Sequence, residues 1–256
     1  LRKLRPADPL PPTWEGIIYN RLGRQGRAKE HFLQALSLDK GFIPALKNLT
    51  LMAARAGDFQ QAESLHRTAL AEHPHNETVR HDYAAYLIER NRFGEAEALL
   101  QATRDQADDP TRRTLMLARL YLRQSKPEKA IDVLLPEAVK STTNPAIYAE
   151  LGNAQKMAGK LHSALNAYRK LAQLKPDSPI PHYLVATTLL ALENYDAAYD
   201  ALSLSLEKDR HHIPALVAAA QVAIKVDRLE DAKVLVERLA VQAPDNNAVP
   251  LIRASI

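Results

Sequence analysis

The sequence predicts an all-α fold in which helical hairpins follow one another as a solenoid. Three observations support this class. Helix-forming residues such as Ala, Leu, Arg, Glu and Gln are abundant, whereas only 8 of 256 residues are Gly. An alanine recurs every 34 residues, a period typical of two-helix repeats. Residues that end helices recur in each period, and a 46% hydrophobic content suits a chain that forms a core.

The recurring alanine sets the register of the repeats. It is found as Ala28, Ala62, Ala96, Ala130, Ala164, Ala198 and Ala232. This register divides residues 9–246 into seven units: 9–42, 43–76, 77–110, 111–144, 145–178, 179–212 and 213–246. Residues 1–8 continue it as the end of a preceding repeat, and residues 247–256 as the start of a further one. We therefore expect an array truncated at both ends.

Repeat arrays normally cover their outermost hairpins with polar residues. The ends of this chain instead carry the apolar residues Leu1, Leu4, Val249, Leu251, Ile252 and Ile256. We expect these ends to be uncapped, so that self-association through them is possible.

Within each unit, small residues at position 8 predict a close crossing of two helices, and larger residues near position 24 fill the space around it. The small residues are Gly16, Thr50, Ala84, Ala118, Gly152, Ala186 and Ala220. The larger ones are Phe32, Leu65, Leu99, Leu134, Tyr168, Leu202 and Leu235. Each unit is expected to be a hairpin of two helices of roughly 14 residues.

Position 15 lies between the two predicted helices. Its residues are Gly23, Gly57, Asn91, Ser125, Gly159, Glu193 and Asp227, and Gly and Asn tolerate the left-handed conformation that ends a helix. Prolines such as Pro74, Pro176 and Pro244 separate the units. Pro136 falls inside a predicted second helix, where we expect a kink or an early end.

This pattern resembles the tetratricopeptide repeat family, which shares its period, the small residues at positions 8 and 20, and the proline at position 32. Four units depart at position 32, with Lys40, Asp108, Thr142 and Arg210. The resemblance implies a right-handed superhelix whose concave groove is lined by first helices and holds a protein or peptide partner. It places in that groove Asn20, Arg21, Lys47, Asn48, Arg55, Arg112, Arg119, Arg123, Asn153, Lys156, Tyr183 and Gln221.

Five of these groove residues form a predicted cationic and amide cluster: Arg112, Arg119, Arg123, Asn153 and Lys156. Such a ladder suits a carboxylate-bearing peptide or an acidic polysaccharide. The alternative is that they are ordinary solvated groove residues, some of them paired with acids. The two-carboxylate clamp of chaperone-binding family members is not matched, because Leu51 stands where that clamp needs Asn.

No catalytic signature is found: the sequence lacks GxxxxGK[ST], GxGxxG, GxSxG and HExxH motifs and has no Cys. His73, His75, His211 and His212 fall in predicted loops, with no third ligand at a metal-binding spacing. We therefore expect no enzyme and no cofactor or metal.

Basic and acidic residues are interleaved along the chain despite its net charge of +4, so nucleic acid is not an expected partner. No segment is apolar enough for a membrane span.

Among tetratricopeptide proteins, three segments resemble bacterial lipoproteins of the exosortase and PEP-CTERM exopolysaccharide systems. They are LARLYLRQSKPEKAIDVL, ELGNAQKMAGKLHSALNAYRKLAQLKPDSP and HHIPALVAAAQVAIK. The resemblance implies a scaffold for exopolysaccharide export or surface-protein sorting, in the bacterial periplasm or at the periplasmic face of the outer membrane; otherwise the cytoplasm is expected. The alternatives are the partner-recognition segment of a larger enzyme such as a glycosyltransferase, and an assembly factor for pili or a secretion machine.

Overall fold

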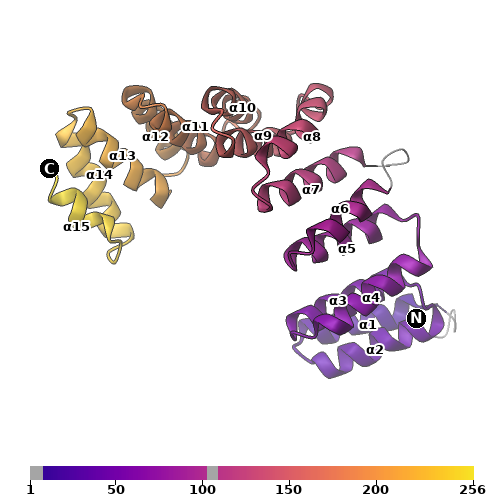
Figure 1. Cartoon of the computed structure of the whole chain (residues 1–256). Coiled ribbons are helices and arrows are strands. Elements are labelled where there is room, and N and C mark those ends of the chain that lie inside the picture. The colour runs from indigo at the N-terminus through magenta and orange to yellow at the C-terminus, as the bar shows by residue number, and fades with distance from the viewer. Residues whose placement is uncertain (1–7, 103–108) are drawn as a thin grey trace. The chain divides into compact units, whose positions relative to one another are not determined.

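The chain is built of helices that follow one another as antiparallel pairs (Figure 1). The computed structural model describes residues 8–102 and 109–256, and in this part it contains 15 helices and no strand. The all-α solenoid class predicted from the sequence is confirmed. Leu1 and Leu4, predicted to be uncapped apolar residues, and Asp108, at position 32 of its unit, lie outside the described residues.

The helices divide into two compact units, Leu1–Met116 and Leu117–Ile256. The first unit contains α1 (Leu10–Arg21), α2 (Gln25–Leu38), α3 (Ile43–Arg55), α4 (Phe59–Glu72), α5 (Glu77–Glu89) and α6 (Phe93–Gln101). Helix α7 (Pro110–Arg123) contributes residues to both units. The second unit contains α8 (Pro127–Lys140), α9 (Pro145–Met157), α10 (Leu161–Leu174), α11 (Pro179–Ala191), α12 (Tyr195–Lys208), α13 (Ile213–Lys225), α14 (Leu229–Gln242) and α15 (Ala248–Arg253).

Odd-numbered helices up to α13 are the first helices of hairpins, and even-numbered ones are the second helices. Within a hairpin, α1 packs on α2, α3 on α4, α5 on α6, α9 on α10, α11 on α12 and α13 on α14. Hairpins join where a second helix also packs on the next first helix, as α2 does on α3, α4 on α5, α8 on α9, α10 on α11 and α12 on α13. The marker alanines from Ala28 to Ala232 are all completely buried at these contacts.

Two hairpins show why position 8 is small. A Cβ atom added to Gly152 would lie 2.4 Å from Cε1 of Tyr168, and one added to Gly16 would lie 2.6 Å from Cε1 of Phe32. Both aromatic rings are buried, so each fills the volume that the glycine leaves open. The close helix crossing expected from the sequence therefore exists in both units.

The turn between the two helices of a hairpin is left-handed at every predicted position. Gly23, Gly57 and Gly159 have φ between 71° and 77°, and the non-glycine residues Asn91, Ser125, Glu193 and Asp227 have φ between 56° and 59°. The amide after each of these residues donates to a carbonyl five residues back, for example Asn194 to Leu189 at 3.0 Å. This is the Schellman arrangement that ends a helix.

Two sequence predictions on local structure are wrong. The predicted early end at Pro136 is wrong, since helix α8 runs through Pro136 to Lys140. Pro136 lies on an exposed face, where the carbonyl that it leaves without a helical partner can meet water. At the C-terminal end, Val249 and Ile252 are not left uncovered, since α15 packs them on the core with exposures of 5% and 3%. Leu251 is exposed, as expected.

Candidate binding groove

A pocket opens between two neighbouring first helices of the first unit, α3 and α5. Its volume is about 230 Å³. Its apolar lining includes Leu46, Leu51 and Ala54 of α3 and Val79, Ala85 and Tyr86 of α5, and His66 of α4 also borders it. We call this cavity the α3–α5 pocket.

Charged residues form the rim of the α3–α5 pocket. Asp82 of α5 accepts from two cations at once, Nζ of Lys47 at 3.1 Å and Nη2 of Arg112 at 3.4 Å. Glu89, about two helical turns further along α5, is exposed beside the pocket. Lys47 and Arg112, two of the cations predicted for the groove, thus lie close together, and Asp82 partly neutralises their charge.

His66 occupies a position that is apolar in the other hairpins. It lies 34 residues from both Phe32 and Leu100, which are completely buried. The His66 ring stacks on Tyr83 with ring centroids 5.1 Å apart and meets Tyr86 at 5.0 Å. Burial removes water from the charged imidazolium and lowers the pKa of His66 to about 4, against the attraction of Asp82 and Glu63. The ring beside the α3–α5 pocket is therefore neutral at pH 7.

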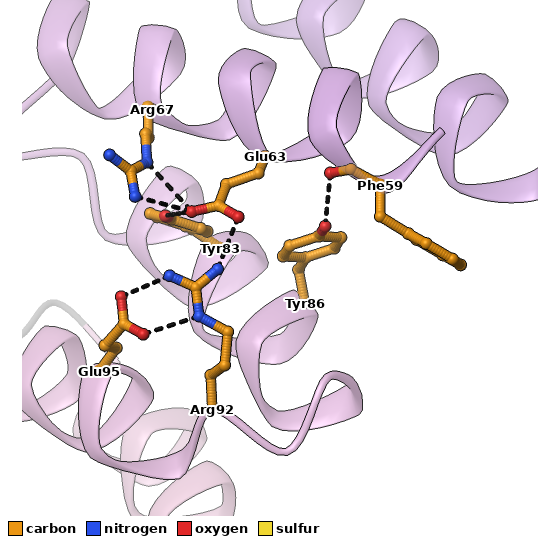
Figure 2. Close-up of polar contacts among 7 residues, drawn as sticks. All are labelled: Phe59, Glu63, Arg67, Tyr83, Tyr86, Arg92 and Glu95. Atoms are coloured by element: carbon orange, nitrogen blue, oxygen red, sulfur yellow. Dashed lines mark hydrogen bonds and ion pairs between the residues drawn. The ribbon is translucent and has the colours of Figure 1, made fainter. Parts of the chain in front are cut away.

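An ion-pair cluster, shown in Figure 2, holds Tyr83, the residue on which His66 stacks. Glu63 of α4 accepts from Arg92 at 2.5 Å, from Arg67 at 2.7 and 3.1 Å, and from the hydroxyl of Tyr83 at 3.3 Å. Arg92 also donates two bonds to Glu95, at 2.7 and 2.6 Å. We call these five residues the Glu63 cluster.

The cations of the Glu63 cluster stabilise the charged form of its central carboxylate, Glu63, and so lower its pKa. Hydrogen bonds from Arg92, and to a smaller extent from Arg67, hold the pKa of Glu63 at about 2. Tyr86 is fixed separately, because its hydroxyl donates to the carbonyl of Phe59 at 2.8 Å (Figure 2). Tyr86, which lines the pocket, and Tyr83, which stacks on His66, are thus each tied to the preceding hairpin by a polar contact.

The other groove residues predicted in the first unit do not gather at the pocket. Asn20 and Arg21 lie at the end of α1, half-buried and exposed respectively. Asn48 bonds within its own helix, donating to the carbonyl of Pro44 at 2.8 Å. Arg55 is exposed at the end of α3.

In the second unit, three predicted groove residues have partners within the chain. Arg119 donates to Glu150 at 2.6 Å. Asn153 accepts from the hydroxyl of Tyr168 at 2.8 Å, and Nζ of Lys156 donates to Thr187 at 3.1 Å. Burial also lowers the pKa of Lys156.

Of the remaining predicted groove residues of the second unit, Tyr183 meets the ring of His212 edge-on at 5.1 Å. Arg123 and Gln221 are exposed on α7 and α13. Arg112 of the predicted cationic cluster belongs to the first unit, whereas Arg119, Arg123, Asn153 and Lys156 belong to the second.

Sequence reasoning missed His66, Glu63 and Arg92, because it searched the first helices for functional residues. His66 could have been found from the sequence, since a histidine stands where the other units have Phe, Leu, Tyr or Val. Glu63 and Arg92 are 29 residues apart, and no sequence pattern indicates that they meet.

Within residues 8–102 and 109–256, His, Asp and Glu form no group of three or more that could hold a metal ion, and none of the described helices has the length and apolarity to span a membrane.

Family profiles identify tetratricopeptide repeats in this chain. Two profiles described as tetratricopeptide repeat match residues 14–42 and 53–116. A third, described as anaphase-promoting complex, cyclosome, subunit 3, matches residues 152–239. The chain therefore contains tetratricopeptide repeats, as its 34-residue pattern predicted.

Solved structures of tetratricopeptide proteins share the fold. The C-terminal part of a TPR repeat-containing protein from Cytophaga hutchinsonii aligns with a TM-score of 0.73 and 14% identity, over 94% of this chain and 98% of that one. YrrB, described as a TPR protein with an unusual peptide-binding site, aligns with a TM-score of 0.54 and 18% identity, over 73% of this chain and 96% of that one. At these identities the similarity shows the fold alone.

One curated relative is an enzyme by name. Human protein O-mannosyl-transferase TMTC1 is 25% identical over 167 residues, which are 63% of this chain. The chain spans only 19% of the length of that relative.

Proposed function

We propose that this chain is a non-catalytic scaffold that binds an extended segment of a partner protein along its first helices. The observation that carries the proposal is the α3–α5 pocket, an apolar cavity of about 230 Å³ between two first helices. This volume is below the roughly 300 Å³ at which sites for small molecules begin, so it suits one apolar side chain of a peptide. The tetratricopeptide repeats support a protein partner.

The walls of the pocket favour binding because they are already in place. Of the lining residues, Tyr86 is hydrogen-bonded to Phe59, and His66 stacks on Tyr83, which the Glu63 cluster holds. A wall that is ordered beforehand loses little side-chain freedom when a partner binds, so more of the contact free energy appears as affinity. Lys47, Asp82 and Glu89 at the rim then select the charges that flank the inserted side chain.

Selection from a random-peptide phage library on the immobilised chain tests this proposal. We expect the selected peptides to share a large apolar residue. The variant Ala85→Trp fills the pocket from an exposed position and should weaken their binding at least about tenfold, as loss of a buried anchor does. Ala98→Trp, at an exposed position of α6, is the matched control and should bind as the parent does. Equal binding by both variants would contradict the proposal.

Recognition of an acidic polysaccharide is the finer prediction that the cationic and amide cluster gave. Arg119 is paired with Glu150, so a polysaccharide would have to displace that acid. Retention of the chain on immobilised alginate, compared with a variant in which Arg119, Arg123 and Lys156 are all Ala, tests it. The role in the bacterial envelope, like the recognition of an acidic polysaccharide, stays a prediction.

A second candidate function is favoured by the similarity to the human O-mannosyl-transferase. We propose as the alternative that these hairpins are the partner-recognition segment of a larger glycosyltransferase. The complete gene decides between the two: a product with a sugar-transferase domain supports the alternative, and a product made only of repeats excludes it.

A further inference from the structure

The imidazole that borders the α3–α5 pocket makes no hydrogen bond within the described part of the chain. The contacts of His66 are ring contacts: its plane lies 13° from that of Tyr83, and Tyr86 meets it at 5.0 Å. Stacking uses neither the donor nor the acceptor of the ring. Because His66 is neutral at pH 7, it has one N–H group and one nitrogen lone pair to offer.

The other polar residues that line the pocket are already engaged or lie in water. The hydroxyl of Thr50 donates to a carbonyl of its own helix at 2.8 Å. Lys47 pairs with Asp82 at 3.1 Å, and Glu89 is exposed at the rim. Among the described residues of the lining, His66 is therefore the uncharged polar side chain whose hydrogen-bonding capacity is still open to a partner.

The hydrogen-bonding capacity of His66 determines which side chain fits the pocket. A purely apolar side chain would remove water from the imidazole and return no hydrogen bond, which costs free energy. Tyrosine has an apolar ring for the apolar lining and a hydroxyl group at its tip. The hydroxyl can donate to the bare nitrogen of His66 or accept from its N–H group, so it suits either tautomer.

We propose that the α3–α5 pocket binds a tyrosine of the partner, whose hydroxyl forms a hydrogen bond with His66. The inference rests on the function proposed above and names the large apolar residue expected there. The repeat register supports it, because this position packs tightly in the other units. The equivalent residues Phe32, Leu100, Leu134, Tyr168, Leu202 and Val236 are at most 1% exposed, whereas His66 is half-buried and reaches the pocket.

A phage library of random peptides whose central residue is Tyr or Phe in equal parts tests the inference, since the two residues differ only in the hydroxyl. Selection on the immobilised chain should enrich Tyr over Phe at least about fivefold, as loss of one hydrogen bond predicts. Equal enrichment of Tyr and Phe overturns the inference and leaves the proposed function standing. If the parent chain retains no more peptide than Ala85→Trp, whose pocket is filled, the proposed function fails and the inference with it.

Two substitutions of His66 test whether its ring gives the preference. His66→Leu has no polar side-chain atom and should bind the Tyr and Phe peptides equally. His66→Gln keeps a donor and an acceptor and should still prefer Tyr. His162→Leu makes the same exchange at an exposed position of α10, and this control should prefer Tyr as the parent does. An undiminished preference for Tyr in His66→Leu would mean that the hydroxyl binds elsewhere, which overturns the role of His66.

Discussion

Replacing His66 by leucine should remove an acid sensitivity from the first unit. The native ring is kept neutral, because burial lowers its pKa from the ordinary 6.5 to about 4. Leucine suits the site, since Leu100, Leu134 and Leu202 stand at the same place in other hairpins and are completely buried. The variant therefore keeps the packing and loses the titrating group.

The sign and size of the effect follow from linkage between protonation and folding. Below pH 6.5 the histidine of the unfolded chain binds a proton, whereas native His66 does not until about pH 4. The free energy of unfolding therefore falls as the pH is lowered from about 6.5 to about 4. At about 1.4 kcal/mol per pKa unit the full loss is about 3 kcal/mol. Partial solvent access to the ring reduces the expected loss to about 1 to 2 kcal/mol.

Urea unfolding followed by circular dichroism at pH 7 and at about pH 4.5 measures this loss within the linkage window. Wild-type protein should lose about 1 to 2 kcal/mol more stability between the two conditions than His66→Leu. His75→Gln is the control, because His75 is exposed, and should behave like wild type. An equal loss in wild type and His66→Leu would refute the assignment of the acid sensitivity to the half-buried His66 ring.

Three further substitutions test the fold. Gly152→Ala should destabilise the second unit by about 1 to 3 kcal/mol in thermal unfolding, because the new Cβ would lie 2.4 Å from Tyr168, whereas Gly94→Ala meets nothing within 4 Å and should be neutral or stabilising. Glu193→Gly should raise stability by about 0.5 to 1 kcal/mol, since φ is 59° there; a lower melting temperature would contradict this. Glu63→Gln should cost about 1 kcal/mol at pH 7. The cost should vanish as the pH falls from 4.5 towards 2, the pKa of the native carboxyl, because the contribution of the charged group is lost there in wild type too.

The periodic features of this chain could be predicted because each is imposed by backbone geometry at every repeat. A left-handed residue is required wherever a helix ends in a Schellman turn, so the register located Ser125 and Glu193 although their side chains do not favour that conformation. Complete burial of the marker alanines follows likewise from the close approach of two helices.

The site features could not be predicted in the same way, because they depend on pairs that the register does not specify. It predicted that Lys47 and Arg112 face the groove, but not that Asp82 would accept from both. Glu63 and Arg92 belong to different hairpins and meet only once α4 packs on α5. Periodicity identifies the face on which a residue lies, whereas the partner on that face depends on the packing of the next hairpin.

The pairing of charges across hairpins determines how a partner can bind. Lys47, Arg112 and Arg119 each already contact a carboxylate, so a carboxylate-rich partner would exchange one ion pair for another and gain little. The α3–α5 pocket has an apolar lining, and covering it with an apolar side chain removes that surface from water without breaking a polar contact. A peptide anchored in the pocket should therefore keep most of its affinity at high salt, whereas an acidic polysaccharide held by exposed cations should lose it steeply. The salt dependence of binding thus separates the two kinds of partner even before either is identified.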